Sequence, residues 1–241
     1  MRGDPSTSLI ADEIARDLRV RITAGALPPG APLRDAALAV EFDASRNTVR
    51  EAVRILRHEG LVEHHLHRGV VVCTLTPAAV RDIYVARRAL ELRAVEESGL
   101  ASEEALAALG AAVRRAEQAV REHAWDEVGT ASLTFHQALV ALLGSPSLDG
   151  FFATVVARLR LAFAVMVDER AFQTPWVARD RHIWELLDRG QRTAGQRELR
   201  FYLDDSERAV LDVIRAHRPP HRRRTPDPDP PMEALTTHDI P

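Results

Sequence analysis

The side chains best suited to recognise another molecule lie together in the run Ser-Arg-Asn-Thr-Val-Arg at residues 45–50. Arginine binds a guanine edge through two hydrogen bonds, and asparagine and threonine bind bases or phosphate oxygens. In a helix, Arg46 and Arg50 are four residues apart and share one face. That face would present donors near the helix N-terminus, where a helix in the major groove meets base edges. Exposed arginines are usually only solvated, so this run alone does not establish DNA binding.

The elements around this run are expected to hold it in place. Residues 8–24 have apolar residues near helical spacing and end at Gly25, whereas residues 27–32 contain three prolines and predict a tight connector. A short helix at about 35–42 precedes a turn, and Ser45 is placed to cap a second helix over residues 46–58. The β-prone runs LVEHH and VVVCT then flank a small hairpin at residues 66–69. This order predicts a winged helix-turn-helix over residues 1–75.

The segment from LPPG at residues 27–30 through SRNTVREAVRILRHEGLVEHHLHRGVVV at residues 45–72 closely resembles the signature of the GntR family of bacterial transcription regulators. The similarity covers residues 8–73. It implies that the start of the second helix contacts operator DNA and that the hairpin forms a wing reaching toward the minor groove. The residues implied are Ser45, Arg46, Asn47, Thr48 and Arg50 on the helix, and His67, Arg68 and Gly69 on the wing.

The match departs from the family at the start of the first helix of the pair. Most relatives have Ser-Glu-Arg there, whereas this chain has Arg34-Asp35-Ala36. The usual arginine is therefore absent at Ala36, and we expect Arg34 to replace it.

Residues 76–217 predict a different architecture, a bundle of six amphipathic helices, so the fold class is mainly α. Thr76 followed by Pro77 is a helix start signal. The chain beyond residue 217 is rich in proline and charge, which predicts a disordered tail over residues 218–241. The six helices are expected at about 77–98, 102–122, 126–143, 147–170, 176–189 and 193–217.

Three segments of this bundle resemble the FCD ligand-binding domain of FadR-type GntR regulators: YVARRALE at 84–91, FHQALVALLGSPSL at 135–148 and RHIWELLDRGQRTAGQRELRFYLDDSERAV at 181–210. Many members hold a divalent metal with an aspartate, a histidine four residues later, and two further histidines. The resemblance places Ser132, His136, His182 and Asp204 at these positions. Of these, His136, His182 and Asp204 would hold zinc, nickel, manganese or iron(II). The alternative is that the histidines are hydrogen-bonded pocket residues without a metal.

Arg87 occupies a position at which the family has an arginine pointing into the ligand cavity, suited to a carboxylate-bearing effector. The alternative is a surface ion pair with Glu91, four residues further on. Tyr202 is expected in the core or the pocket wall. The effector-binding set is therefore Arg87, Ser132, His136, His182 and Asp204.

Composition limits the other possibilities. The net charge is −3, and residues 1–75 contain ten arginines and ten acidic residues, so DNA binding has to come from a local arrangement of charge. The single cysteine, Cys73, excludes an intrachain disulfide. No signal peptide or membrane span is evident, so we expect a cytoplasmic protein without a membrane partner.

The sequence thus predicts a repressor that binds double-stranded operator DNA as a homodimer and responds to a small effector. Two alternatives stay open: a metal-dependent hydrolase using His136, His182 and Asp204, and a helical adaptor without a ligand. No general base, phosphate-binding loop or nucleophile elbow is found, which favours a protein that is not an enzyme.

Overall fold

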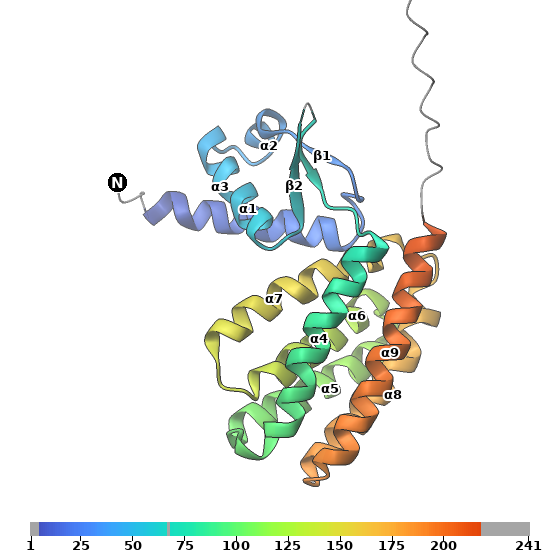
Figure 1. The fold of residues 1–241 in the computed structure, drawn as a ribbon. Helices are drawn as coiled ribbons and strands as arrows, with labels where there is room; N and C mark the ends of the chain where they lie inside the picture. The colour runs from blue at the N-terminus through green and yellow to red at the C-terminus, as the bar shows by residue number, and fades with distance from the viewer. Residues whose placement is uncertain (1–4, 67, 218–241) are drawn as a thin grey trace, which may run out of the picture.

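The computed structural model describes residues 5–66 and 68–217, and its N-terminal part is built on three helices (Figure 1). They are α1 (Pro5–Thr23), α2 (Asp35–Glu41) and α3 (Arg46–His58). Leu18 and Ile22 of α1 are fully buried, as are Val49 and Leu56 of α3, and α1 packs against α3. The expected helix pair is confirmed, and α1 begins a turn earlier than expected.

A three-stranded antiparallel sheet completes the N-terminal part, which we call the head. Its strands are β1 (Pro32–Leu33), β2 (Val62–His65) and β3 (Gly69–Val72), in the order β1-β3-β2. The expected hairpin β2–β3 is confirmed, and the structure places Val62 opposite Val72 and His65 opposite Gly69. The strand β1 was not expected, because its prolines indicated only a connector. Pro32 is tolerated since β1 lies at the sheet edge and pairs on one side only.

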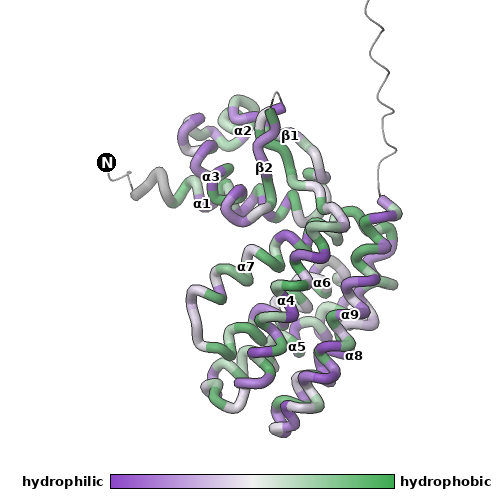
Figure 2. The backbone as a smooth tube through the Cα atoms, in the orientation of Figure 1, coloured by the Kyte–Doolittle hydropathy of each residue, from purple (hydrophilic) through white to green (hydrophobic). Residues whose placement is uncertain are grey.

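The C-terminal part is a bundle of six α-helices within residues 77–216, joined by short turns (Figure 1). Thr76 caps α4 by accepting a hydrogen bond from the Ala79 amide, as its position before Pro77 indicated. Figure 2 shows hydrophobic and hydrophilic residues alternating along these helices, as expected for amphipathic helices on one core. The helices are α4 (Pro77–Glu97), α5 (Glu103–Glu122), α6 (Trp125–Ala141), α7 (Pro146–Arg160), α8 (Glu169–Asp188) and α9 (Arg192–Ala216), with short 3₁₀ helices η1 (Ser98–Leu100) and η2 (Phe163–Val165).

In the bundle, two helix limits differ by several residues from the sequence prediction. The helix expected at 147–170 ends at Arg160, and the next begins at Glu169 instead of residue 176. Asp168 caps α8 through the Ala171 amide, so the helix starts before Pro175 and continues through it. Pro175 is exposed on α8, and its missing donor costs one hydrogen bond in the second turn.

The head and the bundle share one continuous hydrophobic core that runs from α1 through the sheet to α9. Gly60, at the end of α3, has a positive φ of 71° and lies against Arg158 of α7, where a Cβ would be 2.8 Å from the Arg158 Cδ. Gly25 lies in the same way against Ala164 of η2. Because these two glycines have no side chain, the head packs closely against the bundle at both positions.

None of the helices described is long and apolar enough to cross a membrane. The tail expected over residues 218–241 lies outside the described residues.

Candidate functional site

The start of α3 forms an exposed polar surface, as expected for a recognition helix. Ser45 caps the helix and accepts a hydrogen bond from the Thr48 amide at 3.1 Å. Ser45, Arg46 and Asn47 are exposed, and Val49 and Val53 pack inward. Thr48 differs from the expectation, because its side chain is buried and its hydroxyl lies 2.8 Å from that of Ser45. Thr48 therefore supports the cap and does not face outward as a DNA contact.

Arg50 is exposed one turn further along α3 and is already paired. Its Nε donates to Asp35 Oδ2 on α2 at 2.9 Å. Arg34, the residue expected to replace the missing family arginine, is exposed at the N-cap position of α2. The Arg50–Asp35 pair therefore links α3 to the N-terminus of α2, next to Arg34 in the sequence.

The wing carries the other expected DNA contacts. Arg68 and Gly69 are exposed, and Gly69 has a φ of 72°, a conformation that glycine adopts without strain. Leu66, before them, is also exposed. His67, which the sequence also placed at the wing tip, lies outside the described residues.

A second polar cluster is buried in the bundle. Arg87 and Glu91 of α4 do form the ion pair that their spacing allowed, with 2.7 Å between Arg87 Nε and Glu91 Oε1. However, the pair is inside the protein, since the two side chains are 2% and 0% exposed. His136 of α6 joins it, with 2.7 Å between its Nδ1 and Glu91 Oε2. Arg87, Glu91 and His136 thus form one connected network.

Ser132 and Asp180 form a neighbouring pair. The Ser132 hydroxyl donates to Asp180 Oδ2 at 2.8 Å, and Asp180 Oδ1 lies 3.8 Å from His136 Nε2. Tyr202 of α9 is buried, and its ring packs edge-on against His136. Arg87, Ser132, His136 and Tyr202 border a cavity of about 20 Å³, and Asp180 is connected to it through the hydrogen bond from Ser132. Several buried polar atoms here have no hydrogen-bond partner among the described residues: Arg87 Nη2, His136 Nε2, Gln173 Nε2, Trp176 Nε1 and Asp180 Oδ1.

Burial changes the acid strengths in this cluster. Desolvation raises the pKa of Asp180 to about 8. Desolvation also lowers the pKa of His136, so that its ring is neutral. The pKa of Glu91 is lowered even though burial opposes this, because Arg87 and His136 stabilise its charge. At neutral pH the cluster therefore holds one ion pair, Arg87 with Glu91, beside uncharged groups.

The expected metal ligands do not come together. His182 is exposed on α8. Asp204 is half-exposed on α9, where Arg88 donates to its Oδ1 at 2.8 Å. The expectation that His182 and Asp204 join His136 was therefore wrong. Asp180 and Tyr202, each two residues earlier on the same helices, are buried beside His136 in their place, because a shift of two residues turns a helical side chain by about 200°.

The residues at the cavity do not fit a divalent metal. Within residues 5–66 and 68–217, no three histidine, cysteine or acidic side chains are grouped to hold one. His136, Asp180 and Glu91 are the strong ligand types of the cluster, but both oxygens of Glu91 are already bound, to Arg87 and to His136, and Ser132 and Tyr202 are hydroxyl groups. The Arg87 guanidinium, which is close enough to lower the pKa of His136, would also repel a cation.

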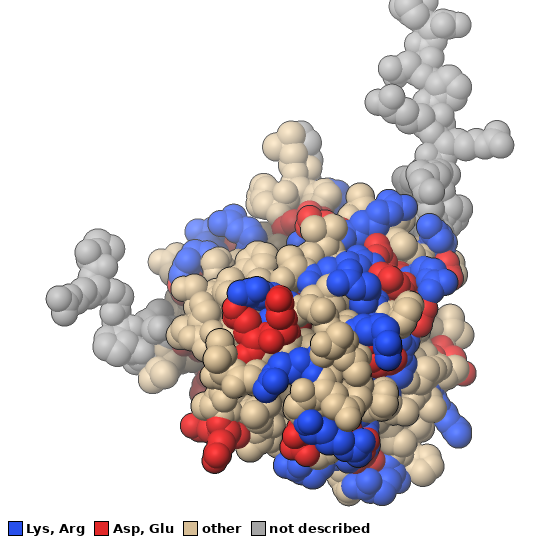
Figure 3. Space-filling model, turned by 60° about the horizontal axis from the view of Figure 1, so that its bottom comes forward, with Lys and Arg blue, Asp and Glu red and all other residues tan. Residues whose placement is uncertain are grey.

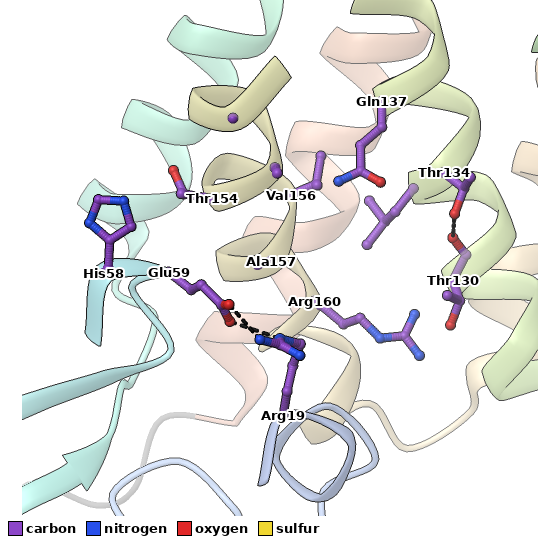
Figure 4. Close-up of a pocket in the computed structure, with 13 residues that line it drawn as sticks. Arg19, His58, Glu59, Thr130, Thr134, Gln137, Thr154, Val156, Ala157 and Arg160 are labelled. Atoms are coloured by element: carbon purple, nitrogen blue, oxygen red, sulfur yellow. Dashed lines mark hydrogen bonds and ion pairs between the residues drawn. The ribbon is translucent and has the colours of Figure 1, made fainter. Parts of the chain in front are cut away.

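A third feature is a cleft of about 510 Å³ between the head and the bundle (Figure 4). Arg19 of α1 and Glu59, just after α3, form its head side, with 2.8 Å between Arg19 Nε and Glu59 Oε2. Thr134 and Gln137 of α6 and Thr154 of α7 line the bundle side.

The surface of the bundle carries charges of both signs. On the bundle face in Figure 3, arginines and carboxylates are interspersed, so this face is not a basic patch.

Comparison with known proteins decides the family. The model of bacterial regulatory proteins of the gntR family matches residues 10–72, and the FCD domain model matches residues 82–205. The chain belongs to the GntR family, in its FadR-like subfamily with an FCD domain. The GntR regulator is thus a DNA-binding transcription regulator and not an enzyme, so the hydrolase alternative is excluded.

Individual relatives agree with this assignment. The regulator is 31% identical over 215 residues to an HTH-type transcriptional regulator in an unstable DNA locus of Streptomyces ambofaciens, covering 86% of this chain and 87% of the relative. It is 32% identical over 129 residues to the gluconate operon transcriptional repressor of Bacillus licheniformis, covering 53% and 52%. The crystal structure of a GntR transcriptional regulator from Rhodococcus sp. RHA1 superposes with a TM-score of 0.78 at 34% identity, covering 84% of this chain and 97% of that one.

The sequence contained a signal for the residue that was missed. Asp180 lies on the buried stripe of α8, between Trp176 and Val177 on one side and Ile183 and Leu187 on the other. A carboxylate in the middle of an apolar helical stripe is an unusual placement, because burying it costs free energy unless it is paired or protonated. The periodicity of α8 therefore favours Asp180 over His182 as the residue that faces inward.

Proposed function

We propose that this GntR regulator is a repressor whose affinity for operator DNA is set by a small carboxylate-bearing effector bound at the buried cluster of the bundle. The main support for an effector site is a set of buried polar atoms around one cavity. These atoms, among them Arg87 Nη2 and His136 Nε2, have no hydrogen-bond partner within the described residues. Buried polar atoms are nearly always hydrogen-bonded, so such a concentration is typical of a ligand site. Repression is supported by the similarity to repressors such as that of the gluconate operon.

The small volume of the cavity gives the effector a way to act. About 20 Å³ holds roughly one water molecule, so a metabolite enters only if the surrounding helices move. Arg87 lies on α4, and only residues 73–76 separate α4 from strand β3 of the wing. A ligand that binds the opened bundle more tightly would therefore shift the position of the head through α4.

We further propose that the regulator binds DNA as a homodimer. One recognition helix reads only a half-site, and two heads related by a two-fold axis read a palindromic operator. A change in the position of each head would change their spacing and hence the operator affinity. Equilibrium sedimentation of the full chain tests this, and a mass of one chain at the concentrations that bind DNA would contradict it.

The experiment that tests the function has two stages. Selection of bound sequences from a random duplex library should recover a palindromic operator, and gel shifts at fixed salt should show preference for it over random competitor. Small carboxylic acids, gluconate among them, are then screened for release of that operator. Arg87→Met should retain operator binding and lose the response to any acid that releases the wild type.

Two results would count against the proposal. Equal affinity for the operator and random DNA at several salt concentrations would remove the regulatory role. Operator binding without any effect of acids, and identical behaviour of Arg87→Met, would instead favour the helical adaptor without a ligand.

A further inference from the structure

Glu91 determines what its two neighbours offer to a ligand. One of its oxygens accepts from Arg87 Nε and the other is 2.7 Å from His136 Nδ1. An ionised carboxylate only accepts hydrogen bonds, so Nδ1 of His136 must carry the proton. In a neutral imidazole the other nitrogen is then an acceptor. Glu91 therefore fixes His136 Nε2 as an acceptor.

Two atoms with opposite roles remain at the cavity. Arg87 Nη2 is a charged donor and His136 Nε2 is an acceptor, and neither has a hydrogen-bond partner in the described part of the chain; Asp180 Oδ1, at 3.8 Å from His136 Nε2, is beyond hydrogen-bond distance. Their side chains are 2% and 1% exposed, so bulk water does not satisfy them. A ligand that meets both has an anionic oxygen for Arg87 and a hydroxyl or N–H group for His136.

The charges at the cavity favour an anion over a cation. The positive charge of Arg87 is already shared with Glu91, and Arg87 Nη2 is still available as a donor. A divalent ion would add two positive charges and find Asp180 as the remaining carboxylate of the cluster, with one oxygen of Asp180 already bound to Ser132. Uncompensated buried charge of this kind is strongly unfavourable.

We propose that the pocket binds its anionic ligand directly on Arg87 and His136, with no divalent metal ion between them. In this arrangement Arg87 supplies the positive charge that a metal would supply, and Glu91 is the positioning residue that orients both. The inference rests on the proposed effector site for its biological role, but the binding chemistry is testable without DNA.

The first test measures metal. Full-length wild-type protein, purified with and without chelator, is analysed for metal content, and its thermal unfolding is followed with Zn²⁺, Ni²⁺ or Mn²⁺ added. We expect no stoichiometric metal and no stabilisation. The matched variant Ser132→Asp/Asp180→His/Tyr202→His places strong ligands around His136 and should gain stabilisation by these ions. Circular dichroism checks that the variant is folded, and Ser132→Asp/Asp180→His is the milder substitute if it is not. Stoichiometric metal in the wild type that is lost in His136→Ala would overturn the proposal.

The second test compares acetate with glycolate, which differ by one hydroxyl donor. Glycolate should bind about threefold to tenfold more tightly than acetate in thermal-shift titrations, the range expected for one added hydrogen bond. Arg87→Met, or Arg87→Lys if that variant is unstable, should weaken both.

Glu91→Gln provides the decisive control. The side-chain amide introduced by this substitution can donate to His136 Nδ1 and so move the proton to Nε2, which removes the preference for glycolate. Nitrogen NMR of the histidine rings reads the tautomer directly. An unprotonated Nδ1 in the wild type, or equal binding of the two acids, would overturn the proposal while leaving the operator-release experiment to decide the proposed function.

Discussion

The Arg50 guanidinium is bound to Asp35 in the free protein, so any contact with DNA has to compete with this pair. An exposed ion pair contributes about 0–1 kcal/mol, whereas a bidentate contact between arginine and guanine is worth about 1–3 kcal/mol. If Arg50 binds a base as we propose, the exchange of Asp35 for that base is therefore favourable.

Replacing Arg50 by alanine should cost about 1–3 kcal/mol of operator affinity, because a base contact is lost. Gel-shift titration at fixed salt measures this. Arg208→Ala is the matched control, since Arg208 is an exposed, ion-paired arginine of the bundle. Equal affinities of the two variants would contradict a role for Arg50 in reading DNA.

Asp180 should make stability fall as pH rises. Its folded pKa of about 8 lies above the ordinary value of 3.8, so the folded protein holds a proton that the unfolded chain has released. The free energy of unfolding therefore decreases between about pH 4 and pH 8 from this group. Asp180→Asn should remove this contribution, and urea titrations at about pH 5 and about pH 8 measure it.

The comparison of Asp180→Asn with wild type is needed because His136 acts in the opposite direction. The pKa of His136 is lowered, so its contribution to stability increases as pH rises toward the unfolded value of 6.5. Glu91 also acts in the opposite direction at the acid end of this window, since its lowered pKa gives a contribution that is complete only above the unfolded value of 4.5. An unchanged pH slope in Asp180→Asn would show that Asp180 is ionised in the folded protein.

Among the secondary-structure elements, α3 has at its N-cap one residue, Ser45, whose structural role is observed and whose contact with DNA is a prediction. Ser45 caps the helix, and the same exposed turn is the one that would approach phosphate. The two roles can be separated because an aspartate also caps helices but carries a negative charge.

Ser45→Ala should lower the free energy of unfolding by about 1 kcal/mol through loss of the cap. Ser45→Asp should keep that stability and still weaken operator binding, since its charge repels the DNA backbone. Denaturation and gel shift on the same preparations distinguish the effects. Tight operator binding by Ser45→Asp would place this turn away from the DNA.

Helix α8 lacks one backbone hydrogen bond at Pro175. This residue is exposed and has no N–H group to donate to the Ala171 carbonyl. Pro175→Ala should raise the free energy of unfolding by about 1–3 kcal/mol. Thr174→Ala, at the neighbouring exposed position, is the control. A loss of stability in Pro175→Ala would mean that the proline rigidity matters more than the hydrogen bond.

Across the molecule as a whole, the core continues from the head into the bundle, and Gly25 and Gly60 allow the two to touch closely. Such continuity predicts one cooperative unit. The chain offers a separate probe for each half, because Cys73 lies beside the wing and the three tryptophans lie in the bundle.

Urea unfolding followed by tryptophan fluorescence and by labelling of Cys73 should give the same midpoint. Cys73 is half-buried, and burial raises the pKa of its thiol to about 11, so labelling is slow in the folded protein. Circular dichroism gives a third curve for both halves. Two separate midpoints would show that the head unfolds independently of the bundle.

Local signals in the sequence were enough to predict the helices, the wing hairpin and the helix start at residues 45–50. Ser45 and Thr76 cap their helices, Gly69 begins the second strand of the wing, and apolar residues recur at helical spacing. The limits around Pro175 were misjudged because a local cap at Asp168 outweighs one missing hydrogen bond.

The composition of the buried cluster, in contrast, became visible only in the folded chain. His182 and Asp204 have suitable chemistry, but His182 is exposed and Asp204 half-exposed, while Asp180 and Tyr202 are buried beside His136. Which residues of α4, α6, α8 and α9 meet depends on the rotation of each helix about its axis. That rotation is set by the packing of all their apolar faces together, and no single segment of sequence contains it.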